Sequence, residues 1–188
     1  MKPLRSKAVE QSTLSSPLRM AIRRLFVLAL LLSGTAQAAS TDALFAAKLV
    51  SSEDKPIALE SFRGKPLIVN FWARWCAPCR VEIPELVKTQ EKYGKRGLTV
   101  IGIGLEDKPE SVRDFMKAYE MSYTVLLAKT GGIDLMQALG NTRAGLPFTV
   151  AIGPKGNIVA SKLGAMNRAE LDAAAEAALT QMGAGATR

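Results

Sequence analysis

The stretch LIVNFWARWCAPCR, residues 67–80, decides the fold and holds the only two cysteines of this 188-residue chain. It opens with a continuous apolar run, Leu67 to Trp72, which is typical of a β-strand covered on both faces. After the cysteines, apolar residues recur at near-helical spacing: Ile83, Leu86, Val87 and Tyr93. The sequence therefore predicts a strand that ends before Cys76, followed by a helix over about residues 77–95.

The rest of the chain repeats this alternation. A second buried strand is expected at 98–105, so that strand, helix and strand form a βαβ unit with a parallel pair. A helix over 109–120, a strand over 123–128 and a short helix over 132–139 follow. Residues 145–164 hold two apolar runs around the turn signal GPKGN, which predicts an antiparallel hairpin. The alanine-rich segment 167–181, with Asn167 as its N-cap, closes the chain as a helix. Residues 39–60 are weakly patterned, with a loop at 51–56.

The N-terminal segment has the features of an export signal. The net charge is +8, of which residues 1–38 supply +5, so the remaining charge does not indicate a nucleic-acid partner. Arg23 and Arg24 precede the apolar run 25–32, and small residues lead to Ala38. We predict a signal peptide over 1–38, with translation beginning at Met20, and a single domain over 39–188. The alternatives are an uncleaved anchor and a buried core helix. However, the apolar run 25–32 is well short of the length that spans a membrane, which is about 20 residues.

The cysteine pair falls where a helix should begin. The first turn of a helix presents free N–H groups and the positive end of its dipole, which stabilise a thiolate at Cys76, and Arg74 and Arg80 add positive charge. Such a thiolate attacks a substrate disulfide, and Cys79, one turn on, resolves the mixed disulfide. A structural zinc site needs about four ligands, and a chain with two cysteines and no histidine does not supply them. A purely structural disulfide is also disfavoured, because this pair closes a very short loop and longer loops gain more stability from a disulfide. Redox chemistry is the favoured reading.

The segment around the cysteines resembles that of a known protein family. The segment VNFWARWCAPCRVEIPEL, residues 69–86, resembles the active-site segment of the thioredoxin superfamily, and more closely that of the exported thiol-disulfide oxidoreductases of the TlpA, ResA and DsbE/CcmG type. Further matching features are RGKPLIVNFWA at 63–73, Glu82, Pro84 and GLPFTV at 145–150. The resemblance covers about residues 59–164 and implies an α/β thioredoxin-like fold, with a central mixed β-sheet flanked by helices.

The resemblance also implies roles for individual residues. Cys76 matches the nucleophile, Cys79 the more buried resolving thiol, and Glu82 a buried acid that tunes both thiols. From the residues alone, Glu82 has two readings: a buried acid with a raised pKa, or an exposed acid favoured by the helix dipole.

Four further residues are implied to contact the substrate chain. Trp75 and Pro78 belong to the cysteine motif itself. Leu146 offers its backbone, and Pro147 matches the family's cis-proline.

These observations predict an enzyme, a periplasmic or otherwise extracytoplasmic thiol-disulfide oxidoreductase. It is expected to reduce disulfides of other exported proteins, for example in cytochrome c maturation, with electrons from a membrane-bound donor. Phe148 stands where the cytochrome branch often has an acid, and the absence of histidine argues against a strong oxidant. We expect no metal, no cofactor beyond the Cys76–Cys79 disulfide, and a monomer. A disulfide-forming oxidase and a copper(I) metallochaperone remain as alternatives.

Overall fold

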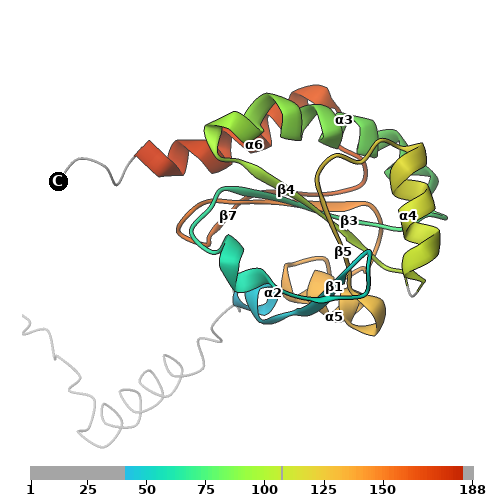
Figure 1. Cartoon of the computed structure of the whole chain (residues 1–188). Helices are drawn as coiled ribbons and strands as arrows, with labels where there is room; N and C mark the ends of the chain where they lie inside the picture. The colour runs from blue at the N-terminus through green and yellow to red at the C-terminus, as the bar shows by residue number, and fades with distance from the viewer. Residues whose placement is uncertain (1–40, 107, 184–188) are drawn as a thin grey trace, which may run out of the picture. The chain divides into compact units, whose positions relative to one another are not determined.

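A computed structural model describes residues 41–106 and 108–183 (Figure 1). The predicted signal peptide, its cleavage after Ala38 and the start at Met20 lie outside the described residues. In the described ranges, no helix is long and apolar enough to cross a membrane.

Seven strands form one mixed sheet in the order β2-β1-β5-β4-β3-β6-β7. β3 and β4 are parallel, as are β4 and β5, whereas β6 runs antiparallel to both β3 and β7. The predicted βαβ unit and the C-terminal hairpin are therefore confirmed. The strands are β1 (Lys48–Ser51), β2 (Pro56–Ala58), β3 (Leu67–Trp72), β4 (Thr99–Gly104), β5 (Thr124–Leu127), β6 (Phe148–Ile152) and β7 (Ile158–Leu163).

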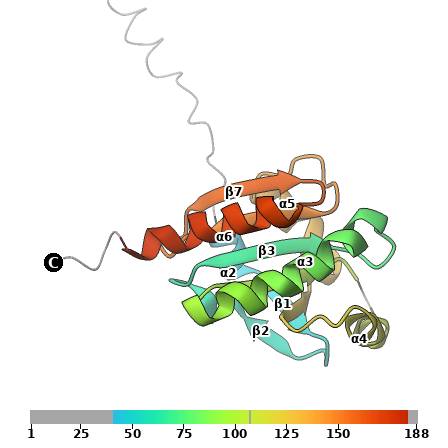
Figure 2. The same cartoon turned by 90° about the horizontal axis from the view of Figure 1, so that it is seen from above.

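Helices cover both faces of the sheet, as predicted. In Figure 1, α3 and α6 lie on one face, and α2 and α5 lie on the other. Figure 2, seen from above, shows α3 and α6 running side by side in front of the sheet. The helices are α2 (Asp42–Ala46), α3 (Ala77–Tyr93), α4 (Pro109–Ala118), α5 (Gly132–Ala138) and α6 (Arg168–Gly183), with 3-10 turns η1 (Leu59–Phe62), η2 (Gly94–Arg96) and η3 (Lys129–Gly131).

The alternation of side chains along β3 explains its continuous apolar run. Leu67, Val69 and Phe71 pack in the core cluster on the side of α2 and α5, whereas Ile68 and Trp72 pack in the cluster on the side of α3 and α6. Because successive side chains of a strand point to opposite faces, a strand covered on both faces needs apolar residues throughout. Asn70, the polar residue of this run, is therefore buried toward α3.

The N-terminal end of the domain contains elements that the sequence did not predict. α2, β1 and β2 all lie in the weakly patterned segment 39–60, although the expected loop is present between β1 and β2. β1 pairs antiparallel with β5, with Val50 opposite Leu127. These elements are short, and β1 is held by a strand distant in sequence, so that local patterning carries little sign of them.

The first turn of α6 has the predicted cap. The Glu170 backbone N–H donates to Asn167 Oδ1 at 3.0 Å, and the Asn167 backbone N–H donates to Glu170 Oε2 at 2.8 Å. This reciprocal arrangement is a capping box, which satisfies N–H groups that the helix itself leaves free.

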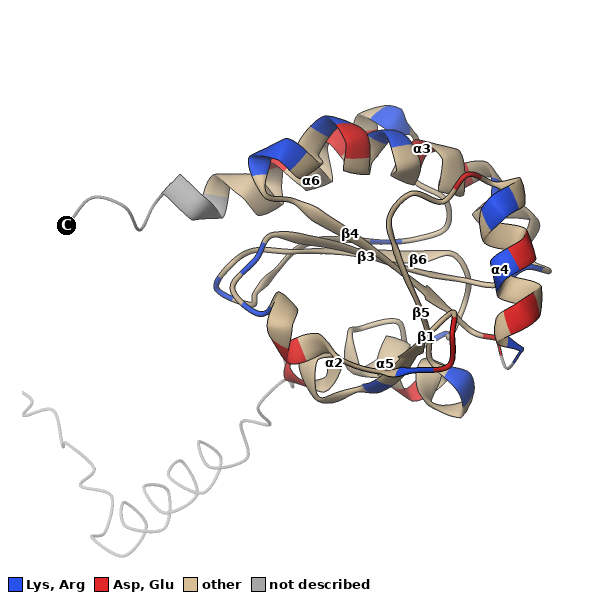
Figure 3. Ribbon diagram, viewed as in Figure 1, with Lys and Arg blue, Asp and Glu red and all other residues tan. Residues whose placement is uncertain are grey.

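Charged residues lie mainly on the outer surfaces of the helices (Figure 3). Both signs are interspersed there, and ion pairs such as Lys92–Asp172, at 3.1 Å, join α3 to α6. The four strands β3, β4, β5 and β6 carry no charged residue.

Candidate active site

The two cysteines form a disulfide at the N-terminus of α3. Cys76 is the N-cap residue, and its Sγ accepts a hydrogen bond from the Cys79 backbone N–H at 3.2 Å. Cys76 is 5% exposed, whereas Cys79 is completely buried. In the reduced state a Cys76 thiolate would stand where this sulfur stands, where it accepts from the Cys79 backbone N–H and lies at the positive end of the helix dipole. The structure thus places Cys76 as the outer sulfur and Cys79 as the inner one.

The residues predicted to contact substrate lie at the same end of the sheet. Trp75, 70% exposed, precedes Cys76, and Pro78, also exposed, lies between the two cysteines. β6 pairs antiparallel with β3, with Phe148 opposite Phe71, which brings the start of β6 to the end of β3. Leu146 and Pro147 immediately precede β6, and the peptide bond between them is cis. Their contact with substrate stays a prediction.

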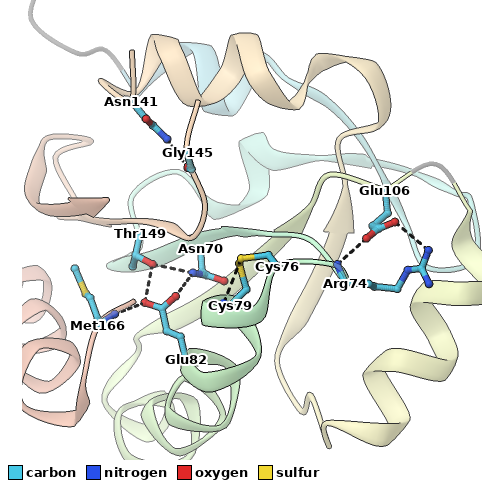
Figure 4. The surroundings of a disulfide bond; sticks show 10 residues. All are labelled: Asn70, Arg74, Cys76, Cys79, Glu82, Glu106, Asn141, Gly145, Thr149 and Met166. Carbon is cyan, nitrogen blue, oxygen red and sulfur yellow. Dashed lines mark hydrogen bonds and ion pairs between the residues drawn. A yellow bond between two sulfur atoms is a disulfide. The ribbon is translucent and has the colours of Figure 1, made fainter. Parts of the chain in front are cut away.

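The carboxyl group of Glu82, a residue of α3, is buried. Glu82 is 1% exposed, which decides between the two readings of the sequence in favour of a buried acid. Its Oε1 accepts hydrogen bonds from the Met166 backbone N–H at 2.9 Å and from Thr149 Oγ1 at 3.2 Å. Its Oε2 accepts from Asn70 Nδ2 at 2.8 Å (Figure 4). Donors from β3, from β6 and from the segment before α6 therefore meet at one carboxyl group.

Burial raises the pKa of Glu82 above its ordinary value, because loss of hydration disfavours the charged form. The hydrogen bonds from Met166, Thr149 and Asn70 oppose this shift in pKa, since they stabilise the carboxylate. Desolvation is the larger effect. A carboxyl group with a raised pKa holds a proton more tightly than an exposed glutamate does, and Glu82, one turn beyond Cys79, is therefore suited to accept and return a proton.

Asn70 and Thr149 are parts of this site that the sequence analysis missed. They face each other across the β3–β6 pair, and Asn70 Nδ2 also donates to Thr149 Oγ1 at 2.8 Å. The sequence contained a signal for both, since each is a polar residue inside an otherwise apolar strand. Both side chains are completely buried.

Arg74 and Glu106 form a second polar cluster beside the cysteines, and the sequence analysis named Arg74 but missed its partner Glu106. Glu106 Oε1 accepts from the Arg74 backbone N–H at 2.7 Å, and Glu106 Oε2 accepts from its guanidinium group at 3.2 Å. The side chain of Glu106 is only 8% exposed. The positive charge expected from Arg74 is therefore matched by a carboxylate, and the loop before Cys76 is anchored to the segment after β4.

In the part of the chain that the structure describes, no three His, Cys, Asp or Glu side chains are grouped so that they could hold a metal ion.

A dithiol–disulfide pair at a helix N-terminus, on a mixed sheet flanked by helices, defines a thioredoxin-like redox protein. The comparisons with known proteins agree. Residues 35–179 match the Redoxin family model. The chain is 28% identical to thiol-disulfide oxidoreductase ResA of Bacillus thuringiensis over 120 residues, which cover 64% of this chain and 67% of ResA. It is 31% identical to the thioredoxin-like protein YneN of Bacillus subtilis over 131 residues, which cover 68% of this chain and 72% of YneN.

Among solved structures, a thiol:disulfide interchange protein of the thioredoxin family from Chlorobium tepidum is 32% identical, with a TM-score of 0.62. The match covers 71% of this chain and 94% of that protein. The chain belongs to the Redoxin family. Its resemblance to the TlpA, ResA and DsbE type is confirmed, and it is a thiol-disulfide oxidoreductase.

Proposed function

We propose that this enzyme is an exported reductase that breaks disulfides in other exported proteins through Cys76 and Cys79. The single observation that carries this proposal is the Cys76–Cys79 disulfide at the start of α3, with a buried acid one turn further on. The pair has an outer sulfur for attack, an inner sulfur for resolution and a nearby proton acceptor.

In the proposed reaction, the Cys76 thiolate attacks one sulfur of the substrate disulfide, and the other substrate sulfur leaves as a thiolate. Cys79 then loses its proton, for which Glu82 is the acceptor, and attacks the Cys76 sulfur of the mixed disulfide. The second substrate sulfur leaves, and two electrons have passed to the substrate. The enzyme ends with the Cys76–Cys79 disulfide.

The direction of electron flow and the cellular setting belong to the proposal too. The CAPC motif has no histidine to stabilise a thiolate, and this favours a reductant over a strong oxidant. The export signal that the sequence predicts at residues 1–38 supports a periplasmic or other extracytoplasmic location. Disulfides persist in such compartments, so that a reductase there needs a steady electron supply, for which we propose a membrane-bound donor. Thiols that must stay free for haem attachment, as in cytochrome c maturation, are the proposed client chemistry.

The reduction potential of the Cys76/Cys79 pair, measured by equilibration with glutathione, tests the direction. A value near that of thioredoxin, about −270 mV, is expected of a reductase. A value near about −120 mV would mark an oxidant and overturn the proposal. Reduction of insulin, with Cys76→Ser as the inactive control, tests the assignment of the nucleophile independently of the potential.

A further inference from the structure

The side chain of Asn70 has one satisfied end and one unsatisfied end. Its Nδ2 donates to Glu82 Oε2 and to Thr149 Oγ1, both at 2.8 Å, so that the orientation of the amide is set by two acceptors. Its Oδ1 is buried and has no hydrogen-bond partner. A buried carbonyl oxygen without a donor is costly, and native proteins seldom keep one without a reason.

The unsatisfied oxygen of Asn70 is turned toward the cysteine pair. Figure 4 shows the Asn70 amide with its nitrogen toward Glu82 and Thr149 and its oxygen toward Cys79. On β3, Asn70 shares the face of Ile68 and Trp72, which pack in the same core cluster as Cys79. A disulfide sulfur has no hydrogen to donate, whereas a thiol does.

We propose that Asn70 is a positioning residue whose Oδ1 accepts a hydrogen bond from the Cys79 S–H group when the pair is reduced. Reduction adds two electrons and two protons, which come from a partner dithiol that becomes a disulfide. The Cys76–Cys79 bond breaks, and the new Cys79 thiol donates a hydrogen bond to Asn70 Oδ1. The same amide holds the Glu82 carboxyl group through its nitrogen, so that one side chain links the resolving thiol to its proton acceptor.

This arrangement favours the dithiol over the disulfide, because only the dithiol satisfies the Asn70 oxygen. Asn70→Leu should therefore shift the equilibrium with glutathione toward the disulfide by about threefold to tenfold, where tenfold corresponds to about 30 mV. An unchanged equilibrium, or a shift toward the dithiol, would overturn the proposal. The inference rests on redox use of the cysteine pair but not on its direction, since the absolute potential tests the proposed function and the difference between variants tests Asn70.

The same comparison in a Glu82→Leu variant distinguishes the effect of the Asn70 oxygen from the effect of the Asn70 nitrogen. In Glu82→Leu the acid is absent, but Thr149 still holds Asn70 Nδ2. Comparing Glu82→Leu with Glu82→Leu/Asn70→Leu should give the same shift toward the disulfide as in the wild-type background. If the shift disappears, Asn70 acts through Glu82 alone and the proposed bond to Cys79 is wrong.

The hydrogen bond has a spectroscopic signature that a purely structural role would not produce. In Cys76→Ser the only thiol of the chain is Cys79, and the infrared S–H stretching band should lie at the lower frequency of a hydrogen-bonded thiol. In Cys76→Ser/Asn70→Leu, or with Asn70→Ala if the leucine variant does not fold, the band should move to the higher frequency of a free thiol. Equal frequencies in the two proteins would contradict the proposal.

Discussion

Glu82→Gln should change how the stability of the enzyme depends on pH. The carboxyl group of Glu82 is 1% exposed, and its pKa is raised from the ordinary value of 4.5 because burial disfavours the charged form. The glutamine variant keeps the shape of the side chain but cannot ionise. Any difference in the pH dependence of the two proteins therefore reports the ionisation of Glu82.

The sign follows from proton binding. Because the folded pKa lies above the unfolded one, the native state binds the Glu82 proton more tightly than the unfolded chain does. The resulting stability is fully present below pH 4.5, decreases as the pH rises, and is lost above the folded pKa. Each unit by which burial raises the pKa corresponds to about 1.4 kcal/mol. Relative to Glu82→Gln, the wild-type protein should lose this amount per unit as the pH rises from 4.5 to above the folded pKa.

Urea unfolding of the disulfide form across this pH range measures the effect, since neither cysteine titrates in that form. Glu91→Gln, which removes an exposed glutamate from the same helix, controls for the loss of one carboxyl group. Parallel stability curves for the wild-type protein and Glu82→Gln would refute the reasoning, because they would mean that folding does not alter the pKa of Glu82.

Four other substitutions test separate parts of the molecule. Cys79→Ser should stop turnover at the mixed disulfide, so that a covalent adduct with a substrate peptide accumulates in mass spectra; its absence would contradict the resolving role. Glu106→Ala should destabilise the fold by about 1–3 kcal/mol, since the Arg74 backbone N–H loses its acceptor. Arg74→Ala keeps that backbone bond and should cost at most about 1 kcal/mol, and urea unfolding giving the reverse order would argue against the anchor. Asn167→Ala should cost about 0.5–2 kcal/mol through loss of the α6 cap, and an unchanged midpoint would count against it.

Much of the fold was predictable because its central elements carry strong local patterns. The run 67–72 is a strand with the predicted bounds, since a strand covered on both faces is predominantly apolar, here with Asn70 as its one polar residue. Helix α3 ends at Tyr93, two residues before the predicted end, where η2 takes over. β1 and β2 were not predictable in the same way, because pairing with β5 and not local alternation holds β1 in the sheet.

The parts of the site that depend on neighbouring residues in the sequence were predictable. The parts that depend on contacts with distant segments were not. Cys76 and Cys79 are recognisable from their spacing and from the strand and helix around them. The residues alone left the burial of Glu82 open, since its hydrogen-bond donors come from Asn70, Thr149 and Met166 in other elements. The sequence predicts only added positive charge from Arg74, because its partner, Glu106, follows a different strand.

The convergence of distant segments on Glu82 limits how far the cysteine motif can be moved between proteins. A segment with both cysteines and all of α3 still lacks Thr149 of β6 and the Met166 backbone N–H before α6. Grafted onto the N-terminus of another helix, it would transfer a disulfide but leave the acid in a foreign environment. A working graft would therefore have to bring β3 with Asn70, β6 with Thr149 and the segment before α6 along with the motif.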